Sequence, residues 1–190
     1  MRKTVLAITL AALTAVGADA KKKPESTGYP ITQVPFTAVK IAQGTFWGQR
    51  IKAARDVTIP LAFSKCESEG RFENFAKAAH PSAEYDVSSF MGYPFDDTDV
   101  YKTIEGASYV LQTYPDKRLE AYIDSVLDIV AAAQEEDGYL YTARTINPAK
   151  PHKWSGKQRW VQEEELSHEL YNLGHMVDAA CAHYQATGSK

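Results

Sequence analysis

The chain has 190 residues, a hydrophobic content of 44% and a formal net charge of −3. This near balance of charge implies no nucleic acid or other polyanion as a partner. The length corresponds to one domain. The sequence contains no phosphate-binding loop, nucleotide-binding fingerprint or serine nucleophile elbow.

The first twenty residues have the features of an export signal. Arg2 and Lys3 give a positive start, residues 5–16 are an apolar run too short to span a bilayer, and Ala18-Asp19-Ala20 is a cleavage site. We expect residues 1–20 to be a signal peptide and the mature protein to be periplasmic or secreted, with no membrane association after cleavage. Residues 21–45 are expected to form an extended N-terminal arm, in which 34–41 is either a short edge strand or part of the extended arm.

Helical periodicity begins at Phe46 and continues to residue 65 with one apolar stripe. Pro60 interrupts this stripe. A kink or a restart is expected there, because proline has no N–H to donate within a helix. A short helix is expected at 71–79, and His80-Pro81 ends it, since a residue before proline is driven out of the helical region.

Two longer helices are predicted next. Asp97 is a suitable N-cap for the first and Asp116 for the second, which continues to Gln134 and stops at Asp137-Gly138. An aromatic loop, 139–158, follows, and structureless loops this long are usually functional.

The last predicted helix spans Trp160 to Gly188 and has two faces that are not polar. One face is aliphatic: Leu166, Leu170, Leu173, Val177 and Tyr184. The opposite face carries small residues and two imidazoles: His168, His175, Ala179 and Ala182. This pattern predicts a helix that packs on one side and lines a cavity on the other, with His168 on the cavity side.

Helical hairpins in sequence, with few strand signals, indicate either a stacked-hairpin array or an α/α toroid. In a toroid, the inner helices contact outer helices on one side and the central cavity on the other. Four or five helices do not close a toroid and leave the last helix uncovered on one face. We therefore expect either the N-terminal part of a longer protein or a partner that covers this face.

The two histidines of the last helix invite a metal-site interpretation. His175 lies seven positions after His168, which is about 10.5 Å along a helix axis and too far to chelate one ion easily. Hydrogen bonding to a polar ligand is favoured for His168, and a satisfied core position for His175. The two cysteines, Cys66 and Cys181, have no zinc-finger spacing, and unpaired thiols are favoured over a disulfide.

An acidic cluster, Asp96, Asp97 and Asp99, lies at a predicted helix start. Carboxylates at this place could be ligands or a general acid/base pair. The favoured interpretation is structural: they cap the helix and interact with its dipole. Phe95 precedes the cap and is either a hydrophobic staple or a platform for the face of a sugar.

Taken together, these motifs resemble the N-terminal part of the β-L-arabinofuranosidase family of glycoside hydrolases (family 127 and its relatives). The matching segments follow the family's order and cover nearly the whole mature chain. They are 45–48 with 57–60, 72–75, 95–102 with Glu105, 132–140, 167–171, 174–175 and 182–188.

The resemblance implies an all-α fold, an (α/α)6 barrel of which residues 46–190 form the N-terminal part of the catalytic domain. It implies retaining hydrolysis of β-L-arabinofuranosidic bonds in arabinose-containing glycans, with a zinc-bound cysteine thiolate as nucleophile and a glutamate as acid/base. The family's sugar-contacting residues match Phe95 and His168. Its nucleophile, zinc ligands and acid/base lie in later helices, so no catalytic residue and no bound zinc are expected in this chain.

Cys66 and Cys181 do not lie in the family's cysteine motif, and the chain by itself is expected to be inactive. Two alternatives stay open. One is a non-catalytic helical module that binds a sugar or a partner through its aromatic loop. The other is a different α/α-toroid carbohydrate enzyme, which uses carboxylates or histidines in place of cysteine.

Overall fold

The computed structural model describes Gly28 and residues 30–189. The predicted signal peptide, residues 1–20, lies outside the described residues. The chain divides into two units, Met1–Gln33 and Val34–Lys190. Of the first unit, Gly28 and residues 30–33 are described, and they form neither helix nor strand. Residues 34–41 contain a short 3-10 turn, η1 (Phe36–Ala38), in place of the edge strand that was one of the two expectations.

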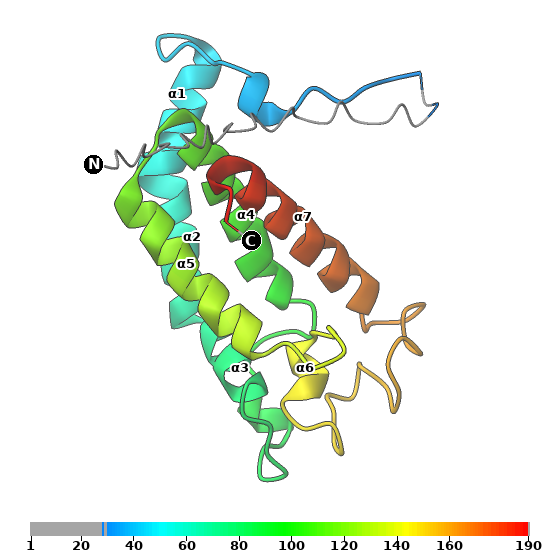
Figure 1. The fold of residues 1–190 in the computed structure, drawn as a ribbon. Coiled ribbons are helices and arrows are strands. Elements are labelled where there is room, and N and C mark those ends of the chain that lie inside the picture. Colours follow the sequence, from blue (N-terminus) through cyan, green and yellow to red (C-terminus); the bar gives the residue numbers. More distant parts are fainter. Residues whose placement is uncertain (1–27, 29, 190) are drawn as a thin grey trace, which may run out of the picture. The chain divides into compact units, whose positions relative to one another are not determined.

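The second unit is built from helices, and no strand occurs among its described residues (Figure 1). Its main elements are α1 (Phe46–Ala53), α2 (Ile59–Ser68), α3 (Arg71–Ala78), α4 (Asp97–Thr113), α5 (Lys117–Ala132), the short α6 (Thr142–Thr145) and α7 (Glu169–Thr187). A second 3-10 turn, η3 (Val87–Ser89), lies between α3 and α4. None of the described helices is long and apolar enough to cross a membrane.

The expected irregularity at Pro60 is confirmed, and it takes the form of a π turn. α1 continues through η2 (Ala54–Thr58), a π-helical segment, directly into α2. Pro60 is the second residue of α2, and its missing N–H removes one hydrogen bond from the continuous helix. The wider π turn before Pro60 leaves room for its ring. The pitch of the helix therefore changes locally, and the helix stays continuous.

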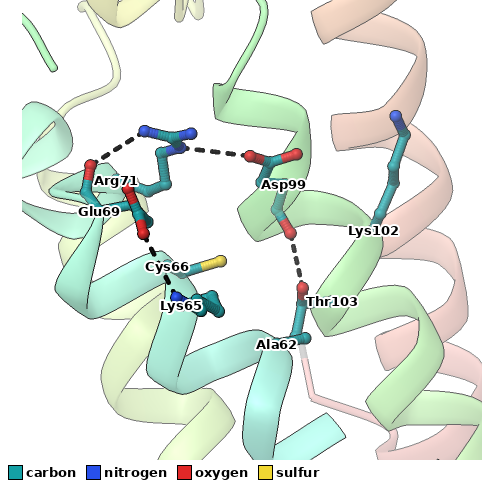
Figure 2. Close-up of a pocket in the computed structure, with 8 residues that line it drawn as sticks. All are labelled: Ala62, Lys65, Cys66, Glu69, Arg71, Asp99, Lys102 and Thr103. Carbon is teal, nitrogen blue, oxygen red and sulfur yellow. Dashed lines mark hydrogen bonds and ion pairs between the residues drawn. The ribbon is translucent and has the colours of Figure 1, made fainter. Parts of the chain in front are cut away.

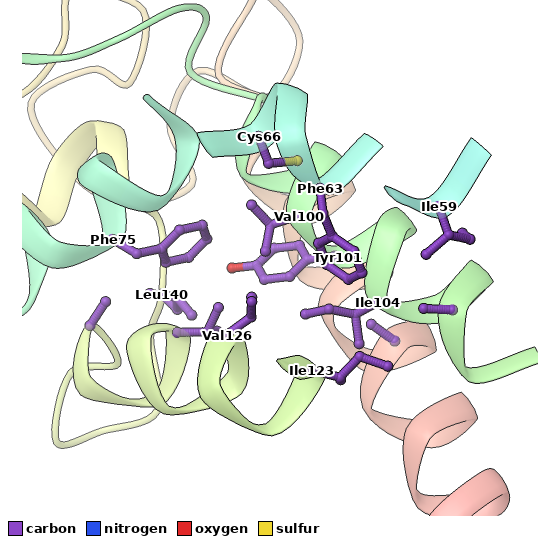
Figure 3. Close-up of a cluster of buried hydrophobic side chains, with 14 of the residues drawn as sticks. Ile59, Phe63, Cys66, Phe75, Val100, Tyr101, Ile104, Ile123, Val126 and Leu140 are labelled. Atoms are coloured by element: carbon purple, nitrogen blue, oxygen red, sulfur yellow. The ribbon is translucent and has the colours of Figure 1, made fainter. Parts of the chain in front are cut away.

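The core lies between α2, α3, α4 and α5 (Figure 3). α2 packs on α4 and α3 packs on α5, and Phe75 meets Tyr101 edge to face with ring centroids 5.8 Å apart. Asp116 caps α5 as predicted, because its Oδ1 accepts the backbone N–H groups of Arg118 (2.9 Å) and Leu119 (3.3 Å). The buried side chains drawn and labelled are Ile59, Phe63, Cys66, Phe75, Val100, Tyr101, Ile104, Ile123, Val126 and Leu140.

The last helix begins later than predicted, at Glu169, not at Trp160. Residues 159–166 form successive turns, and both Trp160 (φ 68°) and His168 (φ 57°) have left-handed backbones that a helix cannot contain. The carboxylate of Glu163 accepts the N–H groups of Glu169 (2.7 Å) and Leu170 (3.3 Å), so it caps α7 from six residues upstream.

The assignment of the two faces of α7 is also reversed. α4 and α7 lie side by side (Figure 1), and the small-residue face of α7, with Ala179 and Ala182 each 3% exposed, packs on α4. Small side chains let two helix backbones approach closely. The aliphatic face, predicted to be the packed one, is exposed: Leu170 58%, Leu173 37%, Val177 49% and Tyr184 52%.

Candidate functional site

The two residues predicted to contact a ligand, Phe95 and His168, lie next to each other. Their ring centroids are 4.9 Å apart, with the ring planes tilted by 51°. Phe95 ends the loop before α4 and His168 immediately precedes α7. Because these two helices run side by side, their N-terminal ends bring together residues that are distant in the sequence. Both side chains are half-buried, so a ligand can reach them.

The loop that carries Phe95 is fixed by short-range hydrogen bonds. Gly92 has a left-handed backbone (φ 86°), and a side chain there would meet the Asp96 carboxylate at 2.3 Å. This turn lets the Tyr93 N–H donate to Asp96 Oδ2 (2.8 Å). Thr98 Oγ1 then donates to the carbonyl of Phe95 (2.9 Å). The backbone at Phe95 is therefore fixed to the start of α4.

Aromatic rings extend the Phe95–His168 pair on both sides. Tyr93 stacks on Phe95 (centroids 5.3 Å apart) and on Trp154 (5.9 Å), so one end of this row comes from the long aromatic loop. At the other end Tyr171 meets His168 edge-on (6.0 Å) and His175 edge-on (4.7 Å). The row is therefore Trp154, Tyr93, Phe95, His168, Tyr171 and His175.

Tyr93 and Tyr171 were not identified from the sequence. Tyr171 follows His168 by three residues, a spacing that places two side chains on one side of a helix and gives a usable signal. Lys102 of α4 donates a hydrogen bond to the Tyr171 hydroxyl, and its ammonium group lies 4.6 Å from the centre of that ring. Tyr93 is 56% exposed, which leaves this row open to solvent.

His168 and His175 each keep an unused hydrogen-bonding atom. The buried Nδ1 of each ring has no hydrogen-bond partner among the described residues. His175 was expected to be a satisfied core histidine, and its unpaired Nδ1 contradicts this. Unpaired buried polar atoms are costly, and both of these atoms are closed off from the surface of the described residues.

The acidic cluster at the start of α4 holds the surrounding loops in place. Asp97 is not the N-cap that was predicted: it is the first helical residue, and its carboxylate accepts the N–H (2.9 Å) and hydroxyl (2.6 Å) of Thr142. Asp96 pairs with Arg71 at 2.8 Å, and Asp99 pairs with the same guanidinium at 3.2 Å. Burial raises the pKa of Asp97 to about 7.

A cleft of about 320 Å³ opens between α2, the start of α3 and α4 (Figure 2). Most charged groups in its lining are already paired: Arg71 with Asp99, and Lys65 with Glu69 at 3.4 Å. Cys66 also lines it, but the residue is 4% exposed and burial raises the pKa of its thiol. A protonated, buried thiol is a poor nucleophile. Both cysteines are unpaired, as expected.

Among Gly28 and residues 30–189, no three His, Cys, Asp or Glu side chains are grouped so that they could hold one ion. The described residues therefore do not fit the zinc–thiolate site that the family resemblance implies.

Comparison with known proteins gives consistent matches. A family profile described as the β-L-arabinofuranosidase GH127 catalytic domain matches residues 38–190. A solved GH127 β-arabinofuranosidase is 71% identical, with a TM-score of 0.78, over 85% of this chain and 25% of its own. The crystal structure of a GH127 β-L-arabinofuranosidase from Geobacillus stearothermophilus T6 is 36% identical, with a TM-score of 0.65, over 76% of this chain and 22% of its own.

A curated non-reducing end β-L-arabinofuranosidase from Bifidobacterium longum is 42% identical over 101 residues, which is 53% of this chain and 15% of that protein. The chain thus spans a quarter or less of the length of these relatives. The described helices match structures that are (α/α)6 barrels, which confirms the predicted fold class: the chain provides part of such a barrel.

Proposed function

Because the chain belongs to the β-L-arabinofuranosidase family with the GH127 catalytic domain, we propose that it supplies part of the sugar-binding site of an exported β-L-arabinofuranosidase. The substrate class is an arabinofuranose-containing glycan or oligosaccharide. The observation that carries the proposal is the Phe95–His168 pair, with ring centroids 4.9 Å apart and both side chains half-buried.

The chemistry of this pair suits a furanose ring. A sugar presents C–H groups on one surface and hydroxyl groups at its edge. An aromatic ring packs against the C–H groups, and a few placed polar atoms fix the orientation of the hydroxyl groups. Phe95 provides the apolar contact in our proposal, and the imidazole of His168 hydrogen-bonds one hydroxyl.

The nucleophile and the acid/base are proposed to come from outside residues 1–190. Two carboxylates of the described acidic cluster are engaged, Asp96 by Arg71 and Asp97 by Thr142, and the Cys66 thiol is buried. These engagements support a binding role for the described residues and not a catalytic one. Export is proposed from the signal-like composition of residues 1–20.

The first test is the intact mass of the protein in an extract of its source, detected through peptides from residues 160–188. A mass several times that of 190 residues supports the proposal that this chain is part of a longer enzyme. The purified protein is then assayed for release of L-arabinose from a β-L-arabinofuranoside. A stable species of the 190-residue size, or ligand binding without hydrolysis, selects the non-catalytic binding module instead.

The second test addresses the two binding residues in the same purified protein. Phe95→Ala and His168→Ala are expected to weaken binding of methyl β-L-arabinofuranoside by at least about tenfold, because each removes one contact worth about 1.4 kcal/mol. His80→Ala, at an exposed position after α3, is the matched control and leaves the affinity unchanged. Equal affinities for all three variants contradict the assignment.

A further inference from the structure

The segment between Trp160 and α7 is organised by one carboxylate. Glu163 Oε1 accepts hydrogen bonds from Ser167 Oγ (2.8 Å) and from the backbone N–H of Glu169 (2.7 Å). Glu163 Oε2 accepts the N–H of Leu170 at 3.3 Å. The two residues that Glu163 holds at short distance, Ser167 and Glu169, are the immediate neighbours of His168 on either side.

His168 itself has a backbone conformation that needs support. Its φ of 57° lies in the left-handed region, which is unfavourable for any residue with a Cβ atom. Such conformations persist only where the surroundings over-determine them. Here the preceding residue is held twice, since Ser167 is fully buried and its carbonyl accepts the Tyr141 hydroxyl at 2.5 Å. The following residue is held by Glu163 and by the start of α7.

This backbone conformation decides where the imidazole points. His168 lies at the N-cap position of α7, one residue before the helical backbone begins. The φ angle sets the direction of the Cα–Cβ bond relative to the backbone at the start of α7. The left-handed φ is therefore part of what places the two rings 4.9 Å apart.

We propose that Glu163 is a positioning residue for the sugar site: it holds both neighbours of His168 and so fixes the imidazole against Phe95. This inference rests on the proposed function for the identity of the ligand, but not for the structural role of Glu163. Its charge also stabilises the N-terminal end of α7, where the helix dipole favours an anion.

The test compares Glu163→Gln with Glu164→Gln, an adjacent exposed carboxylate, in the protein produced from its whole coding sequence. Glutamine keeps the size of the side chain but offers one acceptor in place of two. Hydrogen exchange by mass spectrometry is expected to speed up at least about fivefold in a peptide covering residues 165–171 of the Glu163 variant. Exchange in α4 stays unchanged, and Glu164→Gln behaves as the wild type.

Binding of methyl β-L-arabinofuranoside is measured on the same samples by calorimetry. The dissociation constant of Glu163→Gln is expected to rise about tenfold, which corresponds to the loss of one good contact. Ser167→Ala removes a single hydrogen bond of the set, so it gives a smaller rise in the same direction and serves if Glu163→Gln fails to fold. Unchanged exchange at 165–171, or faster exchange with an unchanged dissociation constant, overturns the inference.

Failure of the proposed function gives a different result. If the wild type does not bind the arabinofuranoside at all, the proposed sugar site is wrong. Hydrogen exchange at residues 165–171 alone then decides whether Glu163 fixes the backbone around His168. Faster exchange in Glu163→Gln supports that role, and unchanged exchange contradicts it.

Discussion

Asp97 is a carboxylate held in an environment that disfavours its charge. The residue is 2% exposed, and burial raises its pKa to about 7 although Thr142 donates two hydrogen bonds to it. The pKa of a free aspartate is about 3.9. Because the folded pKa is raised, the folded state binds more protons than the unfolded state between about pH 4 and 7. The stabilising contribution is therefore complete below about pH 4 and is lost as the pH rises through about 7.

Replacing Asp97 with Asn is expected to remove this pH dependence. The Asn amide accepts the Thr142 N–H and donates to the Thr142 hydroxyl, so both contacts survive without a titratable group. Up to about 1.4 kcal/mol of unfolding free energy per pH unit is expected to disappear from the slope between pH 5 and 7. Urea denaturation at pH 5 and pH 8 measures the free energy of unfolding of both proteins. Relative to the wild type, Asp97→Asn is expected to be more stable at pH 8 than at pH 5. Identical slopes for the two proteins contradict the assignment.

Single residues could be predicted from the sequence where their role is local. Asp116 caps the helix that follows it directly, and it was predicted correctly. Asp97 looked like the same kind of cap, but its partner, Thr142, lies 45 residues downstream, and no local pattern reveals such a pair. Phe95 and His168 were found through a family pattern, whereas Tyr93 and Tyr171 complete the aromatic row only through tertiary packing.

At the scale of elements, α7 illustrates what hydrophobic periodicity can and cannot predict. The period placed the aliphatic and small-residue faces correctly relative to each other. It did not reveal which face packs against α4, because a row of leucines and a row of alanines both suit a helix interface. It also extended the helix back to Trp160, because the left-handed residues and the Glu163 cap leave no periodic signal.

The packing of α7 gives a test at this scale. Ala182→Leu adds volume where α7 meets α4, and overpacking of this kind costs about 1–3 kcal/mol. Leu173→Ala, on the exposed face, is the matched control and is expected to change the stability by no more than about 0.5 kcal/mol. Thermal unfolding of residues 1–190 produced alone, at a dilution where they are monomeric, compares the two variants. A larger loss for Leu173→Ala than for Ala182→Leu means that the packed face of α7 is the aliphatic one.

At the scale of the whole chain, apolar side chains are exposed on two sets of helices. The exposed face of α7 comprises Leu170, Leu173, Val177 and Tyr184, and a second set on α1, η2 and α2 comprises Phe46, Trp47, Val57 and Leu61. Scattered apolar side chains are normal at a surface, but rows of them mark places where other protein surfaces bind. The relatives are much longer than this chain, and in a helical barrel each hairpin is covered by its neighbours.

Residues 1–190 produced alone are therefore expected to self-associate through the exposed face of α7. Replacing both Leu170 and Val177 with Glu puts charges on this face and should shift the sedimentation profile towards the monomer, because both side chains are exposed on the chain by itself. Gln185→Glu, which adds charge at another exposed position of α7, is the control and leaves association unchanged. A monomeric wild type at micromolar concentration contradicts the prediction. It would mean that the exposed rows are too dispersed to form an interface, and that the described helices keep their apolar faces in water without a covering partner.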